Sequence, residues 1–165
     1  MKYQNILVTV DGSKVSEYAF HKAVEVAKRN GAILHIAHVI DIRTYASANP
    51  ESGSIHEQAV TYTETFLKGY KAMAEAEGVK AEVIYESGSA KQLIPKTIAK
   101  RVNADLIVCG STGYNMVERF VLGSVSEAIV RYALCDVLVI KTENMPNTFE
   151  KSDVTKTFTE HLINE

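Results

Sequence analysis

Five short apolar runs alternate along the chain with longer segments whose apolar residues recur every three or four positions. Short continuous runs are typical of buried strands, and the longer spacing is typical of helices. The runs are Ile6–Val10, Ile33–Ile40, Ala81–Tyr85, Asp105–Cys109 and Val137–Ile140. The helical spacing extends from Ala19 to Ala27, from Ile55 to Ala74, from Ile94 to Val102 and from Ala128 to Ala133. This alternation predicts one doubly wound five-stranded parallel sheet with helices on both faces.

Helix-start signals refine two of these helices. Ser89 and Gln92 have the spacing of a capping box, and Ser124 and Glu127 repeat it. We therefore expect Ser124 to cap the fourth helix. Pro95 lies inside the third helical pattern, which predicts a kink or a later helix start there.

The segment after Lys141 is polar. We expect a domain over residues 1–141 and a mobile or loosely docked tail over residues 142–165. The alternative is that Val154, Phe158 and Leu162 form the apolar stripe of one more helix.

Composition narrows the class of protein. The chain has 165 residues, 46% apolar and 23% charged, with a net charge of −2. This net charge shows no excess of basic residues of the kind that binds nucleic acid. There is no apolar run of about 18 residues for a membrane span, and the five apolar-type residues before Asp11 are too few for a signal peptide. Cys109 and Cys135 have no metal-ligand spacing or disulfide framework, so we expect a cytoplasmic protein.

Glycines dominate the segment that follows the fourth strand. Gly110 and Gly113 come directly after the apolar run, and Gly123 precedes Ser124 at the start of the next helical pattern. A strand that leads through a glycine loop into a helix N-terminus is typical of a phosphate cradle. We expect Gly123 to adopt a positive φ so that its backbone approaches phosphate closely. The alternative is that the glycines form two unrelated turns.

A second loop has suitable chemistry at the same end of the sheet. Asp11, Gly12 and Ser13 follow the first strand. Ligands of open α/β sheets bind outside the carboxyl ends of the strands, where the strand order reverses. Asp11 is thus either a ligand-binding residue or the residue that caps the first helix or closes its turn.

The glycine spacing separates this loop from two common nucleotide motifs. The chain has neither Gly-x4-Gly-Lys-Ser/Thr nor Gly-x-Gly-x-x-Gly. The pattern Gly-x2-Gly-x9-Gly-Ser instead resembles the nucleotide loop of the universal stress protein family. Further segments resemble that family in order, and the resemblance covers about residues 3–141. They are residues 5–13, 38–41, 104–108, 123–126 and 135–139.

The resemblance implies a Rossmann-like fold, similar to adenine nucleotide alpha hydrolases, with strand order 3-2-1-4-5. It also implies ATP as ligand, with Mg or Mn bound through the phosphates. Thr9 stands where many relatives carry proline. The residues implied at the adenine and ribose are Thr9, Asp11 and Val39. Those implied at the ribose and phosphates are Gly110, Gly113, Gly123, Ser124, Val125 and Ser126.

The resemblance further implies a homodimer, and the apolar last strand is its candidate edge. The function expected is an ATP-binding stress or signalling protein that acts through nucleotide-dependent conformation or partner binding. We expect no catalytic residues, because no nucleophile, carboxylate pair or Walker lysine is positioned in the sequence. His35 and His38 are three apart on a strand and point to opposite faces, so no metal pair is expected. Two alternatives stay open: a slow ATP-hydrolysing or nucleotidyl-transfer enzyme, and a nucleotide-free dimerisation module.

Overall fold

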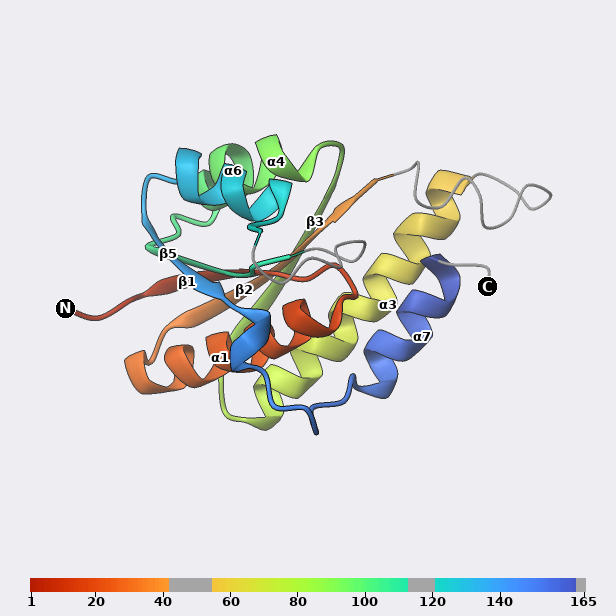
Figure 1. Ribbon diagram of the computed structural model, residues 1–165, viewed down its shortest axis with the longest axis horizontal. Coiled ribbons are helices and arrows are strands. Elements are labelled where there is room, and N and C mark those ends of the chain that lie inside the picture. Colours follow the sequence, from red (N-terminus) through yellow and green to blue (C-terminus); the bar gives the residue numbers. More distant parts are fainter. Residues whose placement is uncertain (42–54, 113–120, 163–165) are drawn as a thin grey trace.

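The computed structural model describes residues 1–41, 55–112 and 121–162, and its centre is a five-stranded parallel sheet (Figure 1). The strands lie in the order β3-β2-β1-β4-β5. This arrangement confirms the predicted fold class and strand order. The bounds are β1 Asn5–Thr9, β2 Ile33–Ile40, β3 Ala81–Ser87, β4 Leu106–Gly110 and β5 Asp136–Ile140.

Helices cover both faces of the sheet (Figure 1). One face carries α1 (Lys14–Asn30), α3 (Ile55–Ala76) and α7 (Asp153–Leu162). The other carries α4 (Ala90–Gln92), the π-helical turn η1 (Leu93–Ile98), α5 (Ala99–Arg101) and α6 (Ser124–Tyr132). A short 3₁₀ turn, η2 (Thr142–Asn144), follows β5. No helix in the described parts of the chain is long and apolar enough to cross a membrane.

Alternation along β2 divides the core into two clusters. Ile36 and Ile40 join the cluster under α1, α3 and α7, whereas Ala37 joins the cluster under η1 and α6. His38 lies on the first side, where its ring contacts Phe66 edge-on. His35 points to the other face and lies 3.6 Å from a carboxylate oxygen of Glu82. The prediction that the two histidines point to opposite faces is therefore confirmed.

Pro95 accounts for the irregular third helix. It lies within η1, where the helix widens for six residues between α4 and α5. Proline lacks the N–H that a regular helix needs and clashes with the preceding turn, so local rearrangement is its usual consequence. The predicted kink or late start thus takes the form of a continuous but widened helix.

The expectation of a mobile tail is wrong for residues 153–162. They form α7, whose Phe158 and Leu162 are buried in the core cluster beside α3. Phe158 stacks on Phe66 of α3 with ring centroids 3.9 Å apart. The helical stripe, rather than the polar composition of the segment, decides its structure, because it gives the helix one face to bury.

Candidate functional site

The strand order reverses between β1 and β4, so the candidate site lies at the carboxyl ends of these two strands. Three segments come together here. They are the turn from β1 to α1, the end of β4, and the N-terminus of α6.

The β1–α1 turn is held by its own side chains. The carboxylate of Asp11 accepts a 2.8 Å hydrogen bond from the backbone N–H of Ser13. The backbone N–H of Asp11 donates to Oγ of Ser16 at 3.2 Å. Ser13, rather than Asp11, caps α1, because its Oγ accepts from the Ser16 N–H at 3.1 Å. Asp11 therefore closes the turn, as one of the two interpretations of the sequence expected.

Ser13 and Ser16 were not among the predicted site residues. Both are buried, and their hydroxyls order the turn that carries Asp11. The available signal was a serine directly before the helical pattern, which is a favoured N-cap. The partnership of Ser16 with Asp11 depends on the folded turn and has no spacing signature.

Gly110 is the junction between the two helix starts. A Cβ at this position would lie 3.0 Å from Cγ1 of Val15 and 3.4 Å from the Ser16 backbone nitrogen. Its carbonyl oxygen accepts a 2.6 Å hydrogen bond from Oγ of Ser126 in α6. The glycine thus allows β4 to approach the start of α1 closely, and it anchors the first turn of α6.

The N-terminus of α6 begins at a glycine, in contrast to that of α1, which begins at a capping serine. Gly123, not Ser124, is the N-cap, and no side chain among the described residues caps the helix. The expected capping box is therefore absent, and Glu127 instead accepts a hydrogen bond from Arg131 at 2.9 Å. The backbone amides of Ser124, Val125 and Ser126 occupy the first turn, where no intrahelical acceptor exists. Such amides, at the positive end of the helix dipole, favour an anion.

Two predicted donors in this segment already have partners. The Gly123 N–H donates to the Ser111 carbonyl at 2.7 Å, and the hydroxyl of Ser126 is used by Gly110. The positive φ expected for Gly123 is wrong: φ is −61° and ψ is 155°, an extended conformation open to other residues. In this extended conformation the Gly123 N–H reaches the Ser111 carbonyl beside the end of β4.

Two other predicted residues lie near the carboxyl ends of β1 and β2. Thr9 ends β1 and is in register with Ala37 of β2. Val39 is half-buried on the face of β2 that packs under η1 and α6. Gly113 lies outside the described residues.

Cys109, directly before Gly110, is a buried thiol. Burial raises its pKa to about 12, and a hydrogen bond with Ser126 offsets only part of that effect. The thiol stays protonated at neutral pH and is inert as a nucleophile. This fits the packing role that its place in an apolar strand indicates.

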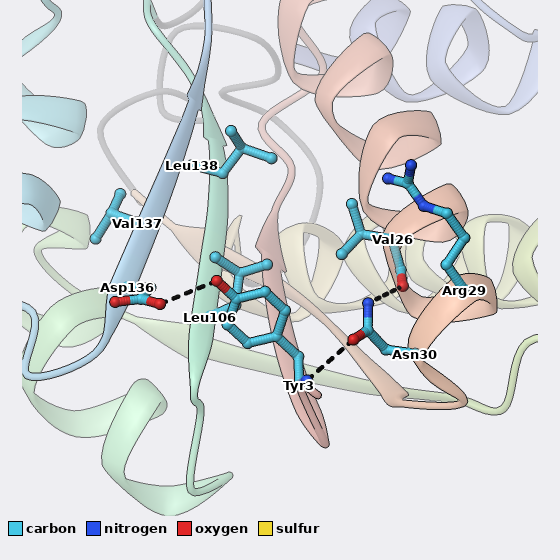
Figure 2. Close-up of a pocket in the computed structure, with 8 residues that line it drawn as sticks. All are labelled: Tyr3, Val26, Arg29, Asn30, Leu106, Asp136, Val137 and Leu138. Carbon is cyan, nitrogen blue, oxygen red and sulfur yellow. Dashed lines mark hydrogen bonds between the residues drawn. The ribbon is translucent and has the colours of Figure 1, made fainter. Parts of the chain in front are cut away.

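A separate pocket of about 660 Å³ lies at the opposite end of the sheet (Figure 2). Three of its polar residues, Tyr3, Asn30 and Asp136, are joined by hydrogen bonds. The Tyr3 hydroxyl donates to Asp136 at 2.9 Å, and the Tyr3 N–H donates to the Asn30 side chain at 3.1 Å. These bonds fasten the N-terminus to α1 and β5, so we give this pocket a structural role.

Comparison with known proteins supports the resemblance. Residues 2–141 match the universal stress protein family, Usp. A protein of Staphylococcus saprophyticus named as a universal stress protein is 50% identical over 159 residues, 96% of this chain and 95% of that protein.

Two solved structures share the fold. The universal stress protein UspA from Lactobacillus plantarum has a TM-score of 0.71 at 26% identity, over 86% of this chain and 99% of that one. A universal stress protein in complex with cAMP has a TM-score of 0.62 at 26% identity, also over 86% and 99%. The chain belongs to the universal stress protein family.

Proposed function

We propose that this protein binds an adenine nucleotide, ATP with Mg²⁺ or Mn²⁺ held through the phosphates, at the carboxyl ends of β1 and β4. It acts in the cytoplasm in stress response or signalling, through nucleotide-dependent conformation or partner binding. The proposed contacts to adenine and ribose are Thr9, Asp11 and Val39. The proposed contacts to ribose and phosphates are Gly110, Gly113, Gly123, Ser124, Val125 and Ser126.

The observation that carries this proposal is the first turn of α6, which no side chain of the described residues caps, at the reversal of strand order. Three backbone amides there have no intrahelical acceptor. Hydrogen bonds from such donors to a charged phosphate contribute about 1.5–3 kcal/mol each. Ser126 would take part through its amide, because its hydroxyl is engaged with Gly110.

The adenine side of the proposal is supported by a relative. A family member that shares the fold at 26% identity forms a complex with cAMP, which is an adenine nucleotide. Val39 offers an apolar surface at the carboxyl end of β2, and Asp11 lies in the turn after β1. A carboxylate is a suitable acceptor for ribose hydroxyls or the adenine amino group.

The direct test is calorimetric titration of the purified protein with Mg-ATP, followed by thermal unfolding with and without the nucleotide. At a ligand concentration one hundred times the Kd, linkage adds about 2.7 kcal/mol to the unfolding free energy. Heat of binding and a raised Tm are expected. Absence of both at millimolar Mg-ATP would overturn the proposal. Phosphate release in the same samples distinguishes a binding protein from the slow ATPase.

We further propose a homodimer through β5. This strand is at the edge of the sheet and pairs only with β4 in the described structure. Val137 and Leu138 point to opposite sides of it (Figure 2), and Leu138 is 37% exposed. An apolar strand edge of this kind invites pairing with a second copy. Val139 instead packs against the cluster under α6, so Leu138→Lys is the sharper test than a change at Val139.

Light scattering at tens of micromolar should give a dimer for the wild type and a monomer for Leu138→Lys. Lysine at position 138 would bury an unpaired charge in the contact. A monomeric wild type, or a variant that stays dimeric, would contradict this placement.

A further inference from the structure

The C-terminal helix α7 packs closely against the rest of the domain. It lies outside residues 2–141, which match the family, so the family pattern gives it no role. It runs beside α3 in Figure 1. Its buried face consists of Thr155, Phe158, Thr159 and Leu162.

Two glycines of the main domain lie where α7 packs so closely that a side chain would clash with it. Gly69 lies within α3, where a Cβ would come within 2.5 Å of Cγ1 and 2.8 Å of Cγ2 of Val154. Glycine inside a helix costs about 1 kcal/mol relative to alanine, so close approach of α7 gives a reason for its presence. Gly12 is the second, since a Cβ there would lie 2.9 Å from Cγ2 of Thr159 and 3.2 Å from Cδ1 of Phe158.

Gly12 is also the residue next to Asp11 in the turn of the proposed nucleotide site. It adopts a φ of +87°, which glycine tolerates and other residues rarely adopt. Phe158 and Thr159 of α7 pack against this glycine. With α7 docked, the turn is confined between these two side chains and the start of α1.

α7 also braces the strand end that precedes Asp11. The ring of Phe158 contacts His38 edge-on at 5.3 Å between centroids. Nδ1 of His38 donates to the Val10 carbonyl at 2.7 Å. The chain from Val10 to Gly12 is therefore held through His38 and directly at Gly12, and both supports rest on Phe158.

A polar anchor fixes the beginning of the tail helix. The backbone N–H of Ser152 donates to the buried carboxylate of Glu17 in α1 at 2.9 Å. The Tyr70 hydroxyl in α3 and Oγ1 of Thr155 lie 2.7 Å apart and share a hydrogen bond. These contacts satisfy polar groups that the packing of α7 buries, so they help to hold the helix against α1 and α3.

We infer that Phe158 and Thr159 are positioning residues for Asp11, so that docking of α7 and binding of adenine nucleotide favour each other. The inference rests on the proposed nucleotide site. Coupling of this kind is reciprocal: undocking α7 weakens nucleotide binding by the same factor by which nucleotide favours docking.

The test changes the α7 contact on α3, outside the turn that carries Asp11. Gly69→Leu places a side chain where Val154 lies, while leucine is a better helix former than glycine. Ala72→Leu, on the exposed part of the same helix, is the matched control. Mg-ATP affinity is measured by calorimetry, and docking by hydrogen exchange of residues 153–162.

In Gly69→Leu we expect fast exchange in α7 and Mg-ATP affinity lower by about 5- to 150-fold, the usual range of coupling between sites. Ala72→Leu should match the wild type in both. A structural role of α7 alone would lower the Tm and leave the affinity unchanged. Unchanged affinity with α7 undocked would overturn the coupling and leave the proposed site intact.

Wild-type exchange decides the matter if Gly69→Leu fails to fold or keeps α7 docked. Saturating Mg-ATP should slow exchange of residues 153–162 by a larger factor than that of β2. Equal or absent slowing would overturn the coupling. A wild type that does not bind Mg-ATP at all would overturn the proposed site and the coupling together.

Discussion

Two helices begin at the same end of the sheet, and their N-termini are built in opposite ways. The first turn of α1 is capped by Ser13, preceded by the closed Asp11 turn and covered by α7. The first turn of α6 begins at the exposed Ser124, without a side-chain cap among the described residues. Both helices follow a strand and a glycine-containing segment. The comparison shows that a strand followed by a glycine-containing segment and a helix is compatible with two different helix starts, one capped by a side chain and one capped by glycine.

Glycine itself has different tasks at the two helix starts. Gly12 has φ of +87° with Thr159 packed against it, whereas Gly123 has φ of −61°. Gly12→Ala should lower the free energy of unfolding by about 1–2 kcal/mol from the left-handed backbone, and the contact with Thr159 adds to this. Gly123→Ala carries no such backbone penalty. Urea unfolding of both variants measures the difference, and equal losses would contradict this assignment.

The serines at the two helix starts should also contribute differently to stability. Ser13→Ala should destabilise the protein by about 1 kcal/mol, because the Ser16 N–H loses its acceptor. Ser124→Ala should change the unfolding free energy much less, since Gly123 is the N-cap of α6 and the Ser124 side chain makes no capping bond to the described residues. A larger loss in Ser124→Ala than in Ser13→Ala would reverse the comparison.

The buried histidine near the start of α1 also predicts that the stability of the protein depends on pH. Burial lowers the pKa of His38 below its usual 6.5, against smaller raising effects from the Val10 hydrogen bond and the charge of Asp11. The phenyl rings of Phe66 and Phe158 also face it. The unfolded chain therefore binds the proton first, so stability is complete above pH 6.5 and falls as the pH drops below it.

His38→Asn retains a donor for Val10 but does not titrate. Its unfolding free energy should fall less steeply between pH 7 and pH 5.5 than that of the wild type. His35, whose pKa is also lowered by burial, is present in both proteins and cancels in the comparison. Equal slopes in the two proteins would show that His38 does not contribute. Glu17 adds acid sensitivity at lower pH: burial raises its pKa, but hydrogen bonds from His21, Thr155 and Ser152 outweigh this and lower it below 4.5.

Much of the fold followed from periodicity. The strands occur where the apolar runs predicted them, and β2 matches residue for residue. The start of α6 was placed within one residue, because the loss of strand pattern and the return of helical spacing are both local signals. The tail helix was misjudged because its polar composition outweighed three apolar residues at helical spacing.

The site was predictable in location but not in hydrogen bonding. Gly110 and Asp11 could be assigned to the reversal of strand order from the sequence. The φ of Gly123, the partner of the Ser126 hydroxyl and the network of Ser16 depend on contacts between segments far apart in the chain. Gly69 was an available signal, since an unexplained glycine inside a helix indicates a close neighbour.

The central claim is that open amides of α6 bind phosphate, and one backbone donor can be removed to test it. Ser124→Pro deletes the amide at the first helical position, where proline is well tolerated. The extended backbone of Gly123, with ψ of 155°, accommodates a following proline. Ser124→Ala is the matched control, because it loses the hydroxyl but keeps the amide.

Calorimetric titration with Mg-ATP compares the two variants directly. Ser124→Ala should bind roughly fivefold more weakly than the wild type at most, for the loss of about 1 kcal/mol from one hydroxyl. Ser124→Pro should be weaker than Ser124→Ala by a further factor of about ten or more, with similar unfolding free energy. Equal Mg-ATP affinity in Ser124→Pro and Ser124→Ala would contradict the claim, because the amide at the start of α6 would then contribute nothing to binding.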